Sequence, residues 1–269
     1  MRFSGCYECH AVDVRSVSRR YPRPGTLCPC TECEEVFTKS ESLEMHQAIQ
    51  HAVSELGPED SGRNIVEIIF KSSWQKIDNP ICSIERILKV HNTQRTISRF
   101  EDYRDSVKAR AQVHLQPSQP KSKNPRCAAD GNELLRFHST SLSCSLGSDG
   151  STSLCLSSAN STPCSVCTII RYGFPRAQQN VGPLGVRTTA SSGRAHDWGP
   201  QSESGPAGRR RAMLVCRVVA GRVKRSGADD VESSGPFDSV SADGSLEELF
   251  VANSRAILPC FVVIYKALD

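Results

Sequence analysis

Two cysteines and two histidines near the N-terminus have the types and spacing of a complete metal-binding set. They follow the pattern Cys30-x2-Cys33-x12-His46-x4-His51. Two thiolates and two imidazoles would supply Zn²⁺ with the four ligands of a tetrahedral structural site. The cysteines are expected on a hairpin knuckle and the histidines on one helix, where their spacing still lets both rings face one metal. We therefore expect these four residues to bind a structural Zn²⁺.

This spacing is that of a C2H2 zinc finger, which we assign to residues 28–57. Phe37 and Leu43 fall where such fingers place their two small-core residues. A ββα module of this size cannot bury enough apolar surface to fold alone, so metal binding and folding are expected to be one event. Cys28 is an alternative first ligand, although Cys28-x-Cys30 does not match the knuckle.

The finger carries an acidic charge pattern. Five glutamates and one lysine, Lys39, leave the segment from Cys30 to His51 with a net charge of −4. Neutralisation of phosphates supplies most DNA affinity, and one finger covers about 3 base pairs. The positions that would read bases are Lys39, Ser42 and Met45. We therefore expect protein partners rather than nucleic acid, and a DNA-binding regulator acting through the finger stays an alternative.

A second cysteine cluster lies in the middle of the chain. Cys144, Cys155, Cys164 and Cys167 fall within 24 residues. Cys164-x2-Cys167 again has a knuckle spacing, and the four thiols together could form a four-cysteine zinc site in residues 144–167. Such a site would organise a Ser-rich segment that has no pattern of its own. The alternative is that these four cysteines are ordinary thiols that bind no metal. If they do form a zinc site, Cys127 could replace one of the four ligands.

Composition limits the class of protein. The chain has 269 residues, 38% hydrophobic, with a net charge of +4, which suits one or two domains with a modest core. Its longest apolar stretch, residues 256–265, is about half of the roughly 20 residues of a membrane span. The first residues lack the long apolar core of a signal peptide. We expect a soluble intracellular protein without membrane partners, nuclear or cytoplasmic, with the nucleus favoured.

Apolar patterns indicate an α+β fold. Residues 1–27 are expected to form a flexible basic arm, and residues 64–269 one loop-rich domain after the finger. Residues 64–74 have helical spacing, with a strand as the alternative, and residues 100–111 are predicted to be helical. Five further segments rich in Val, Ile and Phe are predicted strands: 82–90, 133–138, 212–219, 249–252 and 260–265.

Six short segments follow the motif order of a known family: Cys82–Asn92, Leu134–Thr140, Ile169–Phe174, Gly185–Ala195, Ala212–Gly221 and Glu248–Tyr265. Through them, residues 82–266 resemble the catalytic domain of poly(ADP-ribose) polymerases. Runs such as VSELGPEDSGRNIVEIIF are similar to a plant group that joins one C2H2 finger to such a domain. The resemblance implies an ADP-ribosyltransferase-like mixed or antiparallel sheet with long loops.

The same resemblance implies NAD as cofactor and a His, Tyr and Glu as catalytic residues. His138 matches the His, which holds a ribose hydroxyl. Glu248 matches the Glu, which supports the developing oxocarbenium charge. Arg187 stands where the Tyr stacks on nicotinamide, and Ser139 stands where the family has a Gly beside the nicotinamide amide.

These two replacements count against NAD binding. The Arg187 cation cannot supply the neutral aromatic stack, and the Ser139 side chain crowds backbone that a glycine leaves open. We therefore favour a zinc-binding regulatory or interaction protein with a degenerate ADP-ribosyltransferase-like domain over an enzyme. The alternative is an active NAD-dependent mono-ADP-ribosyltransferase that uses His138 and Glu248.

Overall fold

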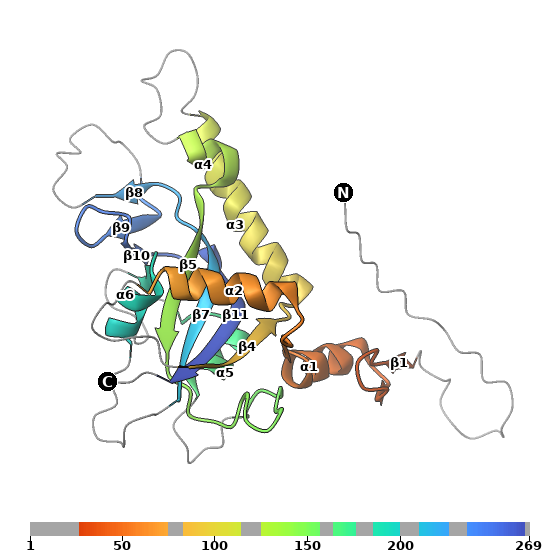
Figure 1. The fold of residues 1–269 in the computed structure, drawn as a ribbon. Helices are drawn as coiled ribbons and strands as arrows, with labels where there is room; N and C mark the ends of the chain where they lie inside the picture. The colour runs from red at the N-terminus through yellow and green to blue at the C-terminus, as the bar shows by residue number, and fades with distance from the viewer. Residues whose placement is uncertain are drawn as a thin grey trace, which may run out of the picture.

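A computed structural model describes residues 27–74, 83–113, 125–156, 164–175, 185–199, 210–225 and 236–266. Over these ranges the chain forms a small two-stranded unit and a nine-stranded sheet with helices on both faces (Figure 1). The predicted α+β class is confirmed. The basic arm predicted for residues 1–27 lies outside the described residues except for Leu27. Among the described helices, none is long and apolar enough to cross a membrane.

The N-terminal unit has a ββα arrangement. Strand β1 (Cys28–Pro29) pairs with β2 (Val36–Phe37) in antiparallel fashion, and helix α1 (Ser40–Gln50) follows. Figure 1 shows this unit projecting from one side of the sheet. No residue of α1 is buried, so apolar packing alone does not account for the folding of this unit.

The large sheet has the strand order β3-β4-β11-β7-β5-β6-β10-β9-β8. Neighbouring strands are antiparallel, apart from the parallel β8–β9 pair, so the sheet is mixed. Its strands are β3 (Val53–Glu55), β4 (Ile84–Val90), β5 (Glu133–Thr140), β6 (Val186–Thr189), β7 (Arg210–Val219), β8 (Val223–Lys224), β9 (Ser239–Ser241), β10 (Glu248–Val251) and β11 (Ile257–Lys266).

Side-chain alternation along the central strands builds one apolar core on each face. On β7, Met213 and Val215 join the core under α2 (Ser61–Ser72) and α6 (Ser192–Asp197). The intervening Leu214 and Cys216 join the core on the other face. That second core lies under α3 (Gln94–Val113), α4 (Pro125–Asp130) and α5 (Ser165–Tyr172), and a short 3₁₀ turn η1 (Ser254–Ala256) precedes β11. Successive side chains of a strand point to opposite faces, so both faces of this sheet are buried.

The predicted elements largely have observed counterparts. The ambiguous segment 64–74 lies mostly in helix α2, whose Val66 and Phe70 are buried one turn apart while Ile65 and Ile68 are exposed. Asp60 caps this helix by accepting from the backbone N–H of Gly62. The predicted helix lies within α3, and the five predicted strands overlap β4, β5, β7, β10 and β11, with ends that differ by at most three residues.

Strand β3 lies inside the range assigned to the finger. Val53 pairs with Val90, and Glu55 pairs with Leu88, so residues 53–55 form the edge strand of the large sheet. The backbone N–H of His91 also donates to the carbonyl of Ala52 at 2.8 Å. The ββα unit therefore passes directly into the sheet, with no free linker after its last histidine.

Candidate metal centres and the Arg187–Glu248 pair

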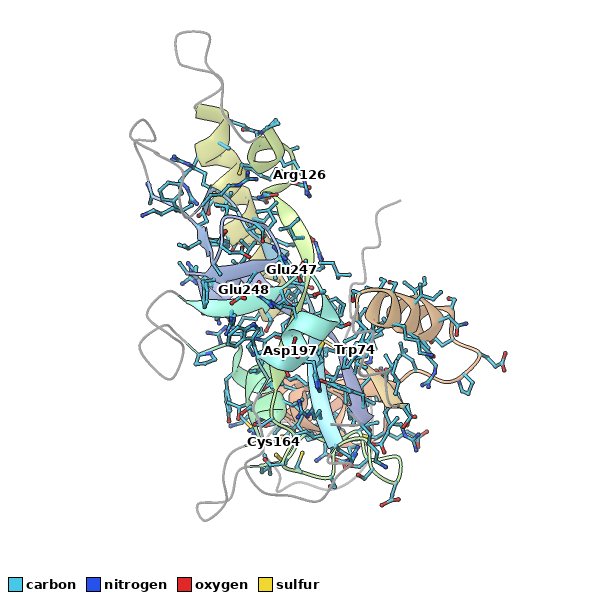
Figure 2. All side chains as sticks on the ribbon, turned by 60° about the vertical axis from the view of Figure 1, so that its left-hand side comes forward. Trp74, Arg126, Cys164, Asp197, Glu247 and Glu248 are labelled. Atoms are coloured by element: carbon cyan, nitrogen blue, oxygen red, sulfur yellow. The ribbon has the colours of Figure 1, made fainter. Side chains whose placement is uncertain are left out.

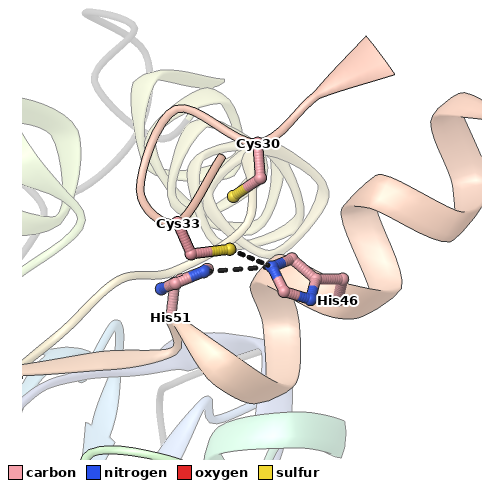
Figure 3. A group of neighbouring side chains, drawn as sticks. All are labelled: Cys30, Cys33, His46 and His51. Carbon is pink, nitrogen blue, oxygen red and sulfur yellow. Dashed lines mark hydrogen bonds between the residues drawn. The ribbon is translucent and has the colours of Figure 1, made fainter. Parts of the chain in front are cut away.

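The four residues of the predicted zinc finger converge on one point. The Nε2 atom of His46 lies 3.1 Å from the Cys33 Sγ and 3.0 Å from the His51 Nε2 (Figure 3). All four ligand atoms, including the Cys30 Sγ, lie within 4.8 Å of one another. At 3.0 Å, at most one of the two facing ring nitrogens can carry a proton, so the other presents a lone pair. A metal ion placed among the two nitrogens and two sulfurs could accept electron pairs from all four atoms. The cluster can thus hold a metal ion and is compatible with zinc.

A tight turn positions Cys30 and Cys33. The backbone N–H of Cys30 donates to the carbonyl of Glu35 at 2.7 Å, and Glu34 donates back to Cys30 at 3.0 Å. Glu34 has a φ of 62°, which closes the turn in the left-handed region. The Glu35 carboxylate lies 3.4 Å from the Nδ1 of His46, where it can orient the ring. Cys28, the alternative ligand, is buried on β1 and lies outside this group.

The second cysteine cluster is also assembled. The sulfur atoms of Cys144, Cys155, Cys164 and Cys167 lie within 4.8 Å of one another, and none forms a disulfide. Cys164 is the N-cap residue of α5 and Cys167 lies in the first turn of that helix. Figure 2 shows sulfur atoms gathered beside Cys164, away from the labelled Glu247 and Glu248. Cys127, the alternative ligand, is buried in α4 outside the cluster.

Distances within this cluster favour a bound cation. The Cys144 Sγ lies 3.5 Å from the Cys164 Sγ and 3.6 Å from the Cys167 Sγ. Burial raises the pKa of Cys144 to about 11, whereas a hydrogen bond from Cys167 lowers the pKa of Cys164. A metal ion bound by all four sulfurs would hold them as thiolates at these short separations.

A third constellation lies where β6 and β10 run side by side. Thr189 pairs with Glu248, and Arg187 pairs with Phe250, so these four side chains share one face of the sheet. The guanidinium of Arg187 forms an ion pair with the Glu248 carboxylate, a residue only 3% exposed. The guanidinium carbon of Arg187 lies 3.7 Å from the centre of the Trp198 ring and 5.6 Å from the centre of the Phe250 ring. Two candidate site residues are therefore bonded to each other.

Trp198 was not singled out by the sequence, yet it forms one wall of this site. It is the C-cap residue of α6 and is 53% exposed, an unusual exposure for a tryptophan. The Ser191 side chain caps the other end of α6 by accepting from the Arg194 N–H. A Cβ at Gly193 would lie 1.8 Å from the Trp74 carbonyl oxygen, so only glycine lets this helix approach the segment just after α2 so closely.

His138 and Ser139 lie near the pair. Among the described residues, neither of these two side chains forms a hydrogen bond with the Glu248 carboxylate. The Nδ1 of His138 lies 2.9 Å from the Arg187 carbonyl oxygen. Since a carbonyl only accepts, Nδ1 carries the proton of this contact, and burial lowers the pKa of the ring. The ring packs edge-on against Phe174 at 5.0 Å. Ser139 lies beside Gly199, the residue after Trp198.

Buried polar contacts fix the start of β10. Arg136, a buried residue of β5, donates to the carbonyls of Leu246 and Glu247 at 2.5 and 3.2 Å. Burial lowers the pKa of Arg136 to about 10. The Glu247 side chain in turn accepts from the Ser191 N–H at 3.1 Å. These contacts hold the backbone just before Glu248 against the segment that follows β6.

Comparison with known proteins adds no family assignment. No protein-family model matches the chain, and a search of curated proteins gives no match. The chemistry of the three constellations therefore carries the functional argument.

Proposed function

We propose that this chain is a zinc-binding regulatory or interaction protein whose large domain resembles an ADP-ribosyltransferase but does not catalyse that reaction. The observation that carries this proposal is the Arg187–Glu248 ion pair. It joins the residue standing at the nicotinamide-stacking position to the carboxylate that the resemblance assigns to a ribose hydroxyl.

This pair competes with a cofactor for the same groups. Glu248 is nearly buried and already has a cationic partner, and the Arg187 guanidinium covers the Trp198 ring. Because the Arg187 side chain is 31% exposed, separating this ion pair costs about 2 kcal/mol. A ligand that needs both the carboxylate and the ring would lose about 30-fold in affinity. An internal cation therefore holds the position that a nicotinamide would need.

The two metal clusters support a structural role for zinc. Both offer sulfur or imidazole donors, which suit Zn²⁺ better than Mg²⁺ or Ca²⁺. Each cluster supplies four protein ligands, which completes a tetrahedral shell and leaves no position for a substrate. Zinc in such sites stabilises a fold. A protein with two closed zinc sites is thus suited to presenting a fixed surface to partners.

The exposed surface of the finger favours protein over nucleic acid as that partner. Glu32, Glu41 and Glu44 are exposed, and so is Met45, at a position that would read a base. Clustered carboxylates repel a phosphate backbone. This charge distribution supports a protein partner, and the nucleus stays the favoured compartment.

Calorimetric titration of NAD into the zinc-loaded full chain tests the proposal. We expect no saturable binding by the wild-type protein at millimolar NAD. Arg187→Tyr, which restores an aromatic ring at the stacking position, should bind NAD more tightly than wild type. Arg194→Tyr is the matched control, because Arg194 lies 6.0 Å from the Trp198 ring but outside the ion pair.

The opposite result would favour the transferase alternative. Saturable NAD binding by the wild-type chain, with automodification that Glu248→Gln abolishes, would show that the Arg187–Glu248 pair opens for the cofactor. The proposal of a non-catalytic domain would then be wrong.

A further inference from the structure

The two candidate metal clusters are joined by hydrogen bonds between residues next to their ligands. The backbone N–H of Leu154 donates to the carbonyl of Ile49 at 3.0 Å. The Ser153 hydroxyl donates to the Gln50 side-chain oxygen at 2.7 Å. The acceptors immediately precede the ligand His51, and the donors immediately precede the ligand Cys155. A short path of bonds thus runs from one candidate metal to the other.

Apolar packing reinforces this path. Ala52 and Val53, which follow His51, belong to the same buried core as Leu154, Cys164 and Cys167. This core therefore contains the exit of the finger, the residue beside Cys155 and two ligands of the cysteine cluster. A displacement of the segment that bears Leu154 would open the core next to the finger.

The loop that carries these donors has little regular structure to hold it. No helix or strand is formed over residues 141–156, all of which are described. Two turn bonds, from Gly147 to Ser151 and from Ser151 to Ser148, close its tip, and Arg210 donates to the Leu146 carbonyl at 3.0 Å. Beyond the tip, the convergence of the four cysteines and the burial of Leu154 hold the loop. A metal in that cluster would therefore set the positions of Ser153 and Leu154.

We propose that the four-cysteine site controls the finger: metal bound by Cys144, Cys155, Cys164 and Cys167 locks residues 141–156 against α1 and so tightens metal binding at His51. The inference rests on the proposed function, since it requires both clusters to bind zinc. The coupling is reciprocal: if metal at the four-cysteine site raises the metal affinity of the finger, metal at the finger raises the affinity of the four-cysteine site by the same factor.

The size of the effect follows from the bonds at stake. Loss of metal from the cysteine cluster would remove two hydrogen bonds next to His51, so the finger should bind metal roughly 10-fold more weakly. Removing only the bond between Ser153 and Gln50 should cost roughly 2- to 10-fold. The finger should also release its metal faster.

Cobalt titration of the full chain can separate the two sites. Co²⁺ bound by four thiolates absorbs at longer wavelength than Co²⁺ bound by two thiolates and two imidazoles, so each site has its own signal. Cys155→Ser removes a ligand of the second site. Ser153→Ala and Gln50→Ala each remove only the side-chain hydrogen bond between Ser153 and Gln50. Leu156→Ala is the control, because Leu156 directly follows Cys155 and is 64% exposed.

We expect Cys155→Ser, Ser153→Ala and Gln50→Ala to weaken cobalt binding at the finger, and Leu156→Ala to leave it unchanged. Ser153→Ala should have no further effect in the Gln50→Ala background, because both changes remove the same bond. Should Cys155→Ser fail to fold, the single-bond variants still decide the matter. Unchanged finger affinity in Ser153→Ala and Gln50→Ala, with both sites filling, would overturn the coupling alone. A chain that fills only one site or neither would instead refute the proposed function.

Discussion

The Arg187–Glu248 pair makes the most quantitative prediction about stability. In Arg187→Met the apolar stem stays on Trp198 while the charge is lost, which leaves a carboxylate that is 3% exposed without its cation. Breaking a fully buried pair costs about 3–5 kcal/mol. Because the Arg187 side chain is 31% exposed, water can reach the site, and we expect about 2 kcal/mol. This corresponds to a fall in Tm of about 4–8 °C.

A double-mutant cycle isolates the pair from other effects. Glu248→Gln keeps the side-chain shape and leaves Arg187 partly hydrated, so it should cost about 1 kcal/mol. The double variant should be less destabilised than the sum of the single variants by about 1 kcal/mol or more. Urea unfolding of the zinc-saturated chain measures all four proteins. Strict additivity, with Arg187→Met within about 0.5 kcal/mol of wild type, would refute the view that this pair is formed and buried.

Three other perturbations have defined outcomes. Chelation should abolish protection of the α1 amides against hydrogen exchange while the central strands stay protected, since α1 buries no residue. Gly193→Ala should destabilise the chain by about 1–3 kcal/mol in thermal unfolding because its Cβ would meet the Trp74 carbonyl, whereas Gly57→Ala, with open space around it, should have little effect. The hydrogen bond from Lys266 lowers the pKa of Glu85 from its ordinary value of 4.5, so its contribution to stability is present above that pH and is lost as pH falls through the lowered pKa. Glu85→Gln should therefore be less stable than wild type above pH 4.5, and the two urea-unfolding curves should converge in acid.

Parts of the fold with strong local patterns could be predicted from the sequence. Cysteine and histidine spacing named a finger ligand set that the structure brings together, because a short knuckle and one helix turn determine that geometry locally. The strands of the sheet centre were visible because runs of Val and Ile serve a sheet buried on both faces. Strands β3, β6, β8 and β9 were missed, since two to four residues are too few to show a period.

Long-range relations could not be read in the same way. Trp198 contacts Arg187 because α6 folds back over the sheet, and Arg187 meets Glu248 because of the register of β6 against β10. Neither relation leaves a local signal. Contacts of Ser153 with the finger helix likewise join residues 103 positions apart in the sequence. Such sites depend on topology, which single-sequence patterns do not determine.

Native mass spectrometry of the full chain, purified under reducing conditions with zinc supplied, tests the central claim most directly. The account predicts a dominant species with two Zn²⁺ per chain, which falls to one in Cys155→Ser. A dominant species with one Zn²⁺ or none, from a protein shown to be folded, would contradict a scaffold built on two closed zinc sites.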